Sequence, residues 1–227
     1  MFKHNKAFTM SEVLIVLAII GVTSAIVLPS LNSDVNERKI VSALRKSYSE
    51  LSAVYQSIVE TYGKPASWNV ASNTTSAVMT NRMGGYFNEM ASVAKDCGTA
   101  VNTGCFSSAN EPNATWRKFL MKDGSSVAIY LFSMEDMQES LETLGEYRCG
   151  GDMGTLKVDV NGPRGENQDG YDTFYFDICY DKGLRPEDVY GLPNPSIDYA
   201  ASWVLQAGNR DYLKCNNLNW NTKRTCD

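Results

Sequence analysis

Apolar positions follow two different patterns in the first 62 residues of the chain. From Phe8 to Leu31 most positions are apolar or small, and Glu12 is the only charged residue. About 20 such residues in a helix match the thickness of a membrane's hydrocarbon core. Further on, apolar residues are spaced three and four apart, which is the period of one helix face. They are Val41, Leu44, Tyr48, Leu51, Tyr55, Ile58 and Tyr62.

Together these patterns predict one long helix over residues 8–63, about 80 Å long at 1.5 Å per residue. Gly63 and Pro65 end it. Its first part, 8–31, is the predicted transmembrane segment, and the apolar stripe of its second part is the predicted packing surface for a head over residues 64–227.

The head has the patterning of a small antiparallel sheet. Residues 65–110 are rich in Ser, Thr, Asn and Gly and predict loops with one short helix over Gly85–Lys95. Strands are predicted in the run that follows a turn at Asp123 and Gly124 and ends at Phe132, and over Thr155–Val160 and Asp172–Cys179. Helices are predicted over Met134–Gly145 and Ser196–Ala207, with Gly208 beyond the second. The fold class is therefore α+β, a long N-terminal helix packed against a head with a small antiparallel sheet.

Three interpretations compete for the apolar run. A secretory signal peptide needs a small-residue cleavage site after its apolar core, but nothing after Leu28 has that form. A plain membrane anchor explains the length but has no use for Phe8 or Glu12. A third interpretation accounts for both residues.

The run KAFTMSEVLIVLAIIGVTSAIVLPSL closely resembles the N-terminus of type IV prepilins and type II secretion pseudopilins. In that family a short basic leader is removed, the new first residue is usually Phe, and Glu is the fifth residue after the cut. Phe8 and Glu12 occupy those positions here. Ala7 stands where the family usually has Gly, and is the next smallest side chain.

The resemblance implies removal of leader 1–7 by prepilin peptidase between Ala7 and Phe8, followed by N-methylation of Phe8. It also implies that Gly21 and Pro29 lie where pilins often place them, in a helix section that can loosen in a filament. Implied partners are identical or related pilin subunits and an inner-membrane assembly platform.

Glu12 has two interpretations. A carboxylate inside hydrocarbon costs roughly 2.5–3.5 kcal/mol on insertion scales. Glu12 therefore either lies near the hydrated headgroups or meets a positive charge from another subunit. The resemblance points to the amine of a processed Phe8 on a neighbouring chain. Lys3 and Lys6 in the leader predict a cytoplasmic N-terminus in the bacterial inner membrane and a periplasmic head.

Composition narrows the function classes. The formal charge is -5, with 21 basic and 26 acidic residues, which does not favour nucleic-acid binding. His4, the one histidine, lies in the leader, so the processed chain has no Ser-His-Asp or Cys-His mechanism and no histidine-ligated zinc. We predict that the protein is not an enzyme and has no catalytic residues.

Six cysteines follow the apolar run, and none forms a C-x-x-C motif. An even number on one side of a membrane segment favours disulfides in an oxidising compartment, with free buried thiols as the alternative. Six cysteines allow 15 connectivities. Our prediction is local pairing: Cys97 with Cys105, Cys149 with Cys179, and Cys215 with Cys226.

The segment DVNGPRGENQDGYD resembles a D-x-N-G-x-x-G-x-N-x-x-G-x-D pattern found in heads of pilin-like secretion proteins. Ca²⁺ prefers several hard oxygen ligands, and the segment offers five side chains that carry them. They are Asp159, Asn161, Asn167, Asp169 and Asp172. The alternative is that these residues only form turns.

The sequence thus predicts a structural subunit, major or minor, of a type IV pilus or a type II secretion pseudopilus, which polymerises through its hydrophobic N-terminal helix. The alternative is a single-pass, membrane-anchored periplasmic or surface binding protein that does not polymerise.

Overall fold

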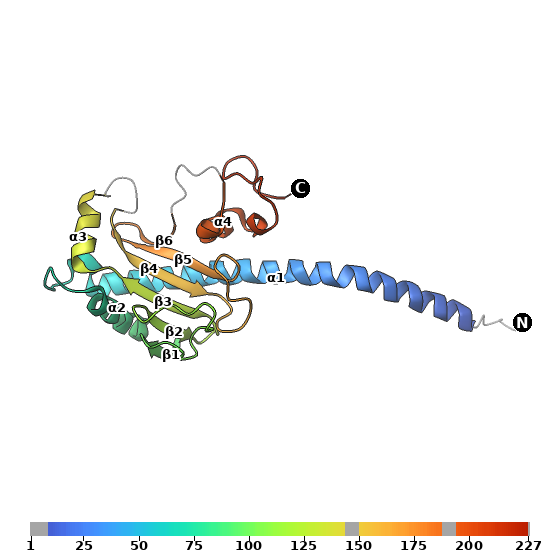
Figure 1. Cartoon of the computed structure of the whole chain (residues 1–227), viewed down its shortest axis with the longest axis horizontal. Helices are drawn as coiled ribbons and strands as arrows, with labels where there is room; N and C mark the ends of the chain where they lie inside the picture. The colour runs from blue at the N-terminus through green and yellow to red at the C-terminus, as the bar shows by residue number, and fades with distance from the viewer. Residues whose placement is uncertain (1–8, 144–149, 188–193, 227) are drawn as a thin grey trace, which may run out of the picture. The chain divides into compact units, whose positions relative to one another are not determined.

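The computed structural model describes the backbone of residues 9–143, 150–187 and 194–226, with side chains throughout these ranges except at 26–34 and 143. Contacts divide the chain into two units, Met1–Lys39 and Ile40–Asp227. Figure 1 shows the helices and the single sheet that make up the α+β fold. The predicted fold class is confirmed.

Helix α1 (Met10–Tyr62) begins in the first unit and ends in the second. Its helical assignment continues through Gly21 and Pro29. It ends where Gly63 adopts a left-handed φ of 81°, and Pro65 follows in the short 3-10 helix η1 (Pro65–Ser67). The predicted end of the helix is confirmed, whereas Phe8, its predicted start, lies outside the described residues.

The first unit exposes a continuous apolar surface. The exposed fractions of Leu14, Leu17 and Val22 are 63%, 60% and 63%. Within the described residues, which leave out 1–8 and the side chains of 26–34, no helix has both the length and the apolarity needed to cross a membrane.

The second unit is built on a six-stranded antiparallel sheet in which every strand pairs with its neighbours in chain order. Strands that follow one another in the chain are therefore also neighbours in the sheet, as in a meander. The strands are β1 (Val93–Gly98), β2 (Arg117–Met121), β3 (Ser126–Leu131), β4 (Asp152–Asp159), β5 (Thr173–Cys179) and β6 (Gly183–Pro186).

The core lies where the second part of α1 packs on this sheet, as Figure 1 shows. Leu44 and Ile58 of the predicted stripe have no exposed surface, and Phe176 of β5 is equally buried. Tyr48 stacks on Phe176 with ring centroids 5.3 Å apart and donates its hydroxyl to the carbonyl of Leu184 at 3.2 Å. The predicted packing role of the stripe is confirmed.

The region before the sheet differs from its predicted structure. A helix over Gly85–Lys95 was expected, but α2 spans Ser76–Met90 and β1 already begins at Val93. Met79, Met83 and Phe87 recur every four residues and form the buried face of α2. The polar composition around them concealed this periodicity.

The later helices follow the sequence more closely. Helix α3 (Met134–Thr143) confirms the helix predicted from Met134, and the predicted end at Gly145 lies outside the described residues. Helix α4 (Ala200–Ala207) ends at Gly208 in the left-handed conformation, as expected. Before it, η2 (Ile197–Tyr199) is a 3-10 turn, and Ser196 makes no side-chain cap bond. A further 3-10 turn, η3 (Asp211–Leu213), follows α4.

Candidate functional site

Thr9 and Glu12 close the first turn of α1 by bonding to each other. The amide and hydroxyl of Thr9 each donate to Glu12 Oε2 at 2.8 Å, and the Glu12 amide donates to Thr9 Oγ1 at 3.3 Å. This is a capping box, which satisfies amide groups that the first turn otherwise leaves free. The carboxylate also lies at the positive end of the helix dipole. The T-x-x-E spacing of Thr9 and Glu12 is the sequence signal for this box.

The loop between β4 and β5 is organised around the buried carboxylate of Asp172, whose exposed fraction is 2%. Its Oδ2 accepts hydrogen bonds from Asn161 Nδ2 at 3.0 Å and from the Asn167 amide at 2.8 Å, while the Gln168 amide donates to Oδ1 at 2.8 Å. A Cβ on Gly165 would lie 2.2 Å from Asn161 Nδ2, so only glycine allows this close approach. The sequence segment is therefore a compact loop with its polar groups turned inward.

Three of the other four predicted metal ligands lie close to the Asp172 carboxylate. Asp159 accepts a hydrogen bond from the Asn161 amide at 3.2 Å, and Asn161 and Asn167 both donate to Asp172. Among the described residues, no three His, Cys, Asp or Glu side chains gather as a metal-binding group. A metal in this loop would therefore depend on the two asparagines as well.

Asp169, the fifth predicted ligand, is engaged by other residues. Its Oδ1 lies 3.3 Å from the ammonium of Lys157 and accepts hydrogen bonds from Tyr175 and Asn110 at 3.1 and 3.2 Å. Lys157 in turn donates to Asn110 Oδ1 at 2.6 Å. Asp169 therefore ties its loop to the segment that contains Asn110, and the predicted five-residue ligand set is not assembled as such.

Asp159 lies in an unusual electrostatic environment. Burial, and next the negative charge of Asp172, raise its pKa to about 7. The amides of Asn161 and Gly162 and the charge of Lys157 lower this pKa but do not cancel the increase. A buried carboxyl of this kind takes up a proton unless a positive charge is supplied to it.

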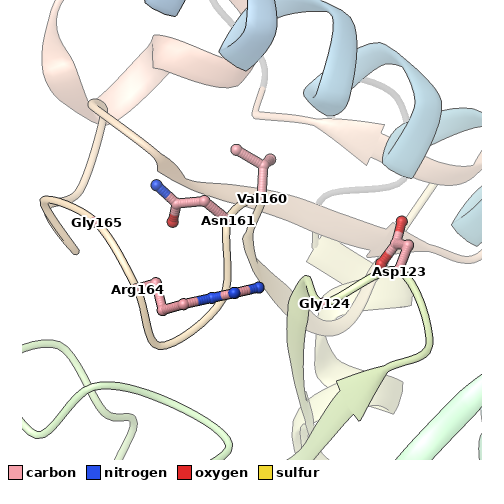
Figure 2. A pocket seen from close by; sticks show the side chains of 6 residues that line it. All are labelled: Asp123, Gly124, Val160, Asn161, Arg164 and Gly165. Carbon is pink, nitrogen blue, oxygen red and sulfur yellow. The ribbon is translucent and has the colours of Figure 1, made fainter.

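An open pocket of about 360 Å³ adjoins the loop (Figure 2). It is lined by Asp123, Gly124, Val160, Asn161, Arg164 and Gly165. The side chain of Arg164 reaches across the pocket toward Gly124, with Nη2 3.2 Å from the position of a Cβ there. Asn161 and Gly165 belong both to the pocket wall and to the surroundings of Asp172, so the pocket lies directly beside this carboxylate.

Residues 2–28 match the family model of the prokaryotic N-terminal methylation motif. This is the prepilin-type signal of type IV pilins and pseudopilins. No curated protein and no solved structure matches the chain.

The match confirms the prepilin-type signal predicted from the sequence. The matched residues include Ala7, Phe8, Glu12 and Gly21 and end one residue before Pro29. A signal of this type belongs to membrane-anchored, pilus-related precursors that prepilin peptidase processes. Ala7 and Phe8 lie outside the described residues, so the signal has a described geometry only from Thr9 onward.

Downstream of the prepilin-type signal, two of the three predicted disulfides are confirmed. Cys97 is bonded to Cys105, and Cys215 to Cys226. Cys179 is also disulfide-bonded. Its predicted partner, Cys149, lies outside the described residues, so this pairing stays a prediction.

Lys118 is a buried charge that the sequence pattern does not indicate. It has no exposed surface, and its ammonium donates to the carbonyls of Thr99, Ala100, Asn113 and Trp116 at 2.9, 3.2, 3.1 and 3.3 Å. These carbonyls belong to the segment that precedes β2, which Lys118 therefore holds against the sheet. A lysine in a five-residue strand gives no sequence signal for such a role.

Proposed function

We propose that this chain is a structural subunit of a type IV pilus or a type II secretion pseudopilus, polymerised through the first part of α1. The observation that carries the proposal is the prepilin-type signal at residues 2–28. The exposed apolar side chains of α1 support it, among them Leu14, Leu17 and Val22. An apolar surface of this extent is typical of a segment that contacts lipid or another protein.

The proposed route begins with cleavage between Ala7 and Phe8 by prepilin peptidase and N-methylation of Phe8. Residues 8–31 then hold the subunit in the inner membrane, with the head on the periplasmic side, until an assembly platform moves it into the filament. Repeated head-to-tail contacts that do not close generate a helical polymer. The role of the chain in this scheme is structural rather than catalytic.

Glu12 is the proposed register residue of assembly. Its bonds with Thr9 fix the carboxylate at the first turn of α1, only four positions beyond the proposed new N-terminus at Phe8. A carboxylate held there can meet the amine of a processed Phe8 on the next subunit, which neutralises both charges in an apolar bundle. Gly21 and Pro29 are the proposed points at which the helix adapts to the filament.

A membrane-anchored binding protein that never polymerises is the alternative. It would need the apolar run but neither the processed amine nor Glu12. The two hypotheses therefore separate on one substitution, Glu12→Ala, with Glu50→Ala as the matched control. Glu50 is an exposed carboxylate on the same helix, 3.8 Å from Lys46.

In the test, the full chain is expressed together with prepilin peptidase and the assembly machinery. Membrane and sheared-filament fractions are then isolated. We expect mass spectrometry to find an N-methylated Phe8 at the N-terminus of both variants and of the unmodified sequence. Glu12→Ala should remain in the membrane and fall at least about tenfold in the filament fraction, since a buried unpaired charge costs several kcal/mol. Glu50→Ala should assemble normally.

Two results would contradict the proposal. Retention of Met1 in assembled protein would show that the signal is not cleaved. Processed protein of unaltered sequence that is absent from filaments, with the machinery present, would favour the anchored binding protein.

A further inference from the structure

Three polar side chains from distant parts of the head contact one another in a closed triangle. The ammonium of Lys157, on β4, donates to Asn110 Oδ1 at 2.6 Å and lies 3.3 Å from Asp169 Oδ1. The remaining side is the Asn110 amide nitrogen, Nδ2, which donates to the same Asp169 oxygen at 3.2 Å. Lys157 is only 5% exposed, so the triangle closes over a buried amine. An amine and a carboxamide held together in this way are a nucleophile and an acyl group.

The amine of Lys157 lies close to the carbon that it would attack. Asn110 Oδ1 is one carbonyl bond, about 1.2 Å, from the side-chain carbon Cγ. Lys157 Nζ is therefore at most about 3.8 Å from Cγ of Asn110. Reacting atoms in a near-attack arrangement are about 3–3.5 Å apart, so a small movement of either side chain brings the two atoms into reaction distance.

Neighbouring side chains hold the two reactants in place. Asn110 Nδ2 also donates to Oγ1 of Thr173 on β5, a fully buried residue, at 3.2 Å. The ammonium of Lys157 lies 5.1 Å from the ring centroid of Tyr175, its partner in the pairing of β4 with β5. Tyr175 in turn donates its hydroxyl to Asp169 Oδ1 at 3.1 Å. Reactants that are fixed in advance avoid much of the entropy cost of meeting, which accelerates a reaction within one molecule.

Asp169 Oδ1 contacts both nitrogen atoms whose protonation must change. The Lys157 nitrogen has to lose a proton before it attacks and another afterwards, and Nδ2 of Asn110 has to gain one before it can leave. The carboxylate oxygen lies 3.3 Å from the first nitrogen and 3.2 Å from the second. A carboxyl group within reach of both atoms can act first as a general base and then as a general acid.

We propose that Lys157 and Asn110 form an isopeptide bond within the head, with Asp169 as the proton carrier. The ammonium of Lys157 gives one proton to the Asp169 carboxylate, and the freed electron pair forms a bond from Nζ to Cγ of Asn110. The Cγ–Nδ2 bond then breaks, and Nδ2 leaves as ammonia with a second proton from Nζ, passed on through Asp169. Nζ keeps its third proton as the amide hydrogen, and the first proton passes from Asp169 to solvent. The reaction needs no oxidant, reductant or second substrate.

The bond anchors the segment between β1 and β2 to the middle of the sheet. Asn110 and Lys157 are 47 positions apart, and β4 is an inner strand that pairs with both β3 and β5. The disulfide between Cys97 and Cys105 fixes the earlier part of this region. Thiols can reduce that disulfide, whereas they do not cleave an amide. The proposal is independent of the filament function, because the bond forms within one head.

The test is peptide mapping of the full chain, purified in detergent micelles, then denatured, reduced, alkylated and digested with trypsin. Trypsin cuts after unmodified Lys and Arg, which places Asn110 in peptide 96–117 and ends another peptide at Lys157. We expect tandem mass spectrometry to find peptide 96–117 joined to peptide 149–164, uncut at Lys157 and lighter by one ammonia. A succinimide formed by Asn161 and Gly162 also releases ammonia but joins no peptides, so fragment ions from both peptides are decisive.

Four variants separate the roles of the three residues. Asn110→Ala and Lys157→Arg remove the acyl group and the amine, and neither should give the joined peptide. Asp169→Asn keeps the size of a side chain that is 47% exposed, so the head should fold, and newly synthesised chains should form the bond at least about a hundredfold more slowly. Asn113→Ala is the matched control, since this side chain of the same segment accepts a hydrogen bond from Thr115; it should react like the unmodified chain.

Three results would overturn the proposal. The first is folded, unmodified protein that gives the two peptides separately and no joined species. The second is a joined peptide in Asn110→Ala, because another acyl group would then have reacted. The third is Asp169→Asn that is folded by circular dichroism and forms the bond as fast as Asn113→Ala.

Discussion

Replacing Lys118 with Met should loosen the segment that precedes β2 and lower the free energy of unfolding. The ammonium of Lys118 reaches four carbonyl oxygens, on Thr99, Ala100, Asn113 and Trp116, at 2.9–3.3 Å. It carries three protons, so at least one proton is shared between two of the four carbonyls. Met has a similar length and no donor, and would leave all four carbonyls without this partner.

The magnitude follows from two opposing contributions. Hydrogen bonds to a charged group are worth about 1.5–3 kcal/mol each, or roughly 4–9 kcal/mol for three. Against this, a buried ammonium loses several kcal/mol of hydration. Burial lowers the pKa of Lys118, and the charge of Glu111 only partly opposes that shift. The net loss on substitution should therefore be about 2–4 kcal/mol.

Urea denaturation followed by circular dichroism measures this loss, and limited proteolysis locates it. Lys118→Met should be cut between residues 99 and 116 at protease concentrations that leave the unmodified protein intact. Lys122→Met is the control, because Lys122 is exposed; it should change stability by less than about 0.5 kcal/mol. If Lys118→Met matched this control in both assays, the carbonyl cage would contribute nothing and the reasoning would fail.

Three further substitutions test other parts of the head. Leu44→Ala should lower the free energy of unfolding by about 2–5 kcal/mol in urea, because Leu44 is fully buried between α1 and the sheet; a loss below about 1 kcal/mol would place α1 outside the core. Burial raises the pKa of Asp96, but the Arg117 hydrogen bond at 2.5 Å and the Gly98 amide outweigh it and lower the pKa. The stabilisation is therefore present above about pH 4 and lost as the pH falls through the lowered value, so Asp96→Asn should cost about 1–2 kcal/mol at pH 7 and progressively less as the pH falls below about 4. Asp159 has its pKa raised to about 7, so its ionised form opposes folding. In EDTA the stability of the unmodified chain should fall between about pH 4 and pH 7, by at most about 4 kcal/mol; Asp159→Asn should remove this slope, and an unchanged slope would assign the titration to another group.

The helical parts of the fold could be predicted because their signals are local. The spacing of Leu44, Leu51 and Ile58 depends only on neighbours along α1, and all three are buried as expected. Gly208 likewise ends α4 through its own backbone conformation. The period and the end of a helix can be predicted from residues within one or two turns, without knowledge of the rest of the chain.

Strands β1, β2 and β6 were missed because their burial depends on distant segments. β1 carries no strict alternation of apolar and polar residues, and its pairing with β2 is interrupted by irregularities. β2 contains Lys118, whose buried ammonium donates hydrogen bonds to backbone carbonyls within residues 99–116. β6 has four residues and ends in a proline. Hydropathy alone cannot identify strands of these kinds.

The candidate ligands show the same limit within a single loop. Composition placed Asp169 and Asp172 in one set, and they are only three positions apart. The difference comes from β4, where Lys157 forms an ion pair with Asp169 at 3.3 Å. The position of this lysine on a neighbouring strand could not be predicted from the loop sequence.

Asp159 and Asp172 are both buried, but their carboxylates have different hydrogen-bond partners. Asp172 accepts hydrogen bonds from Asn161, Asn167 and Gln168, so it can hold the loop together without a cation. Asp159 keeps one oxygen without a described partner and has a raised pKa. The loop should therefore keep its fold as the pH rises, and lose stability only through the ionisation of Asp159.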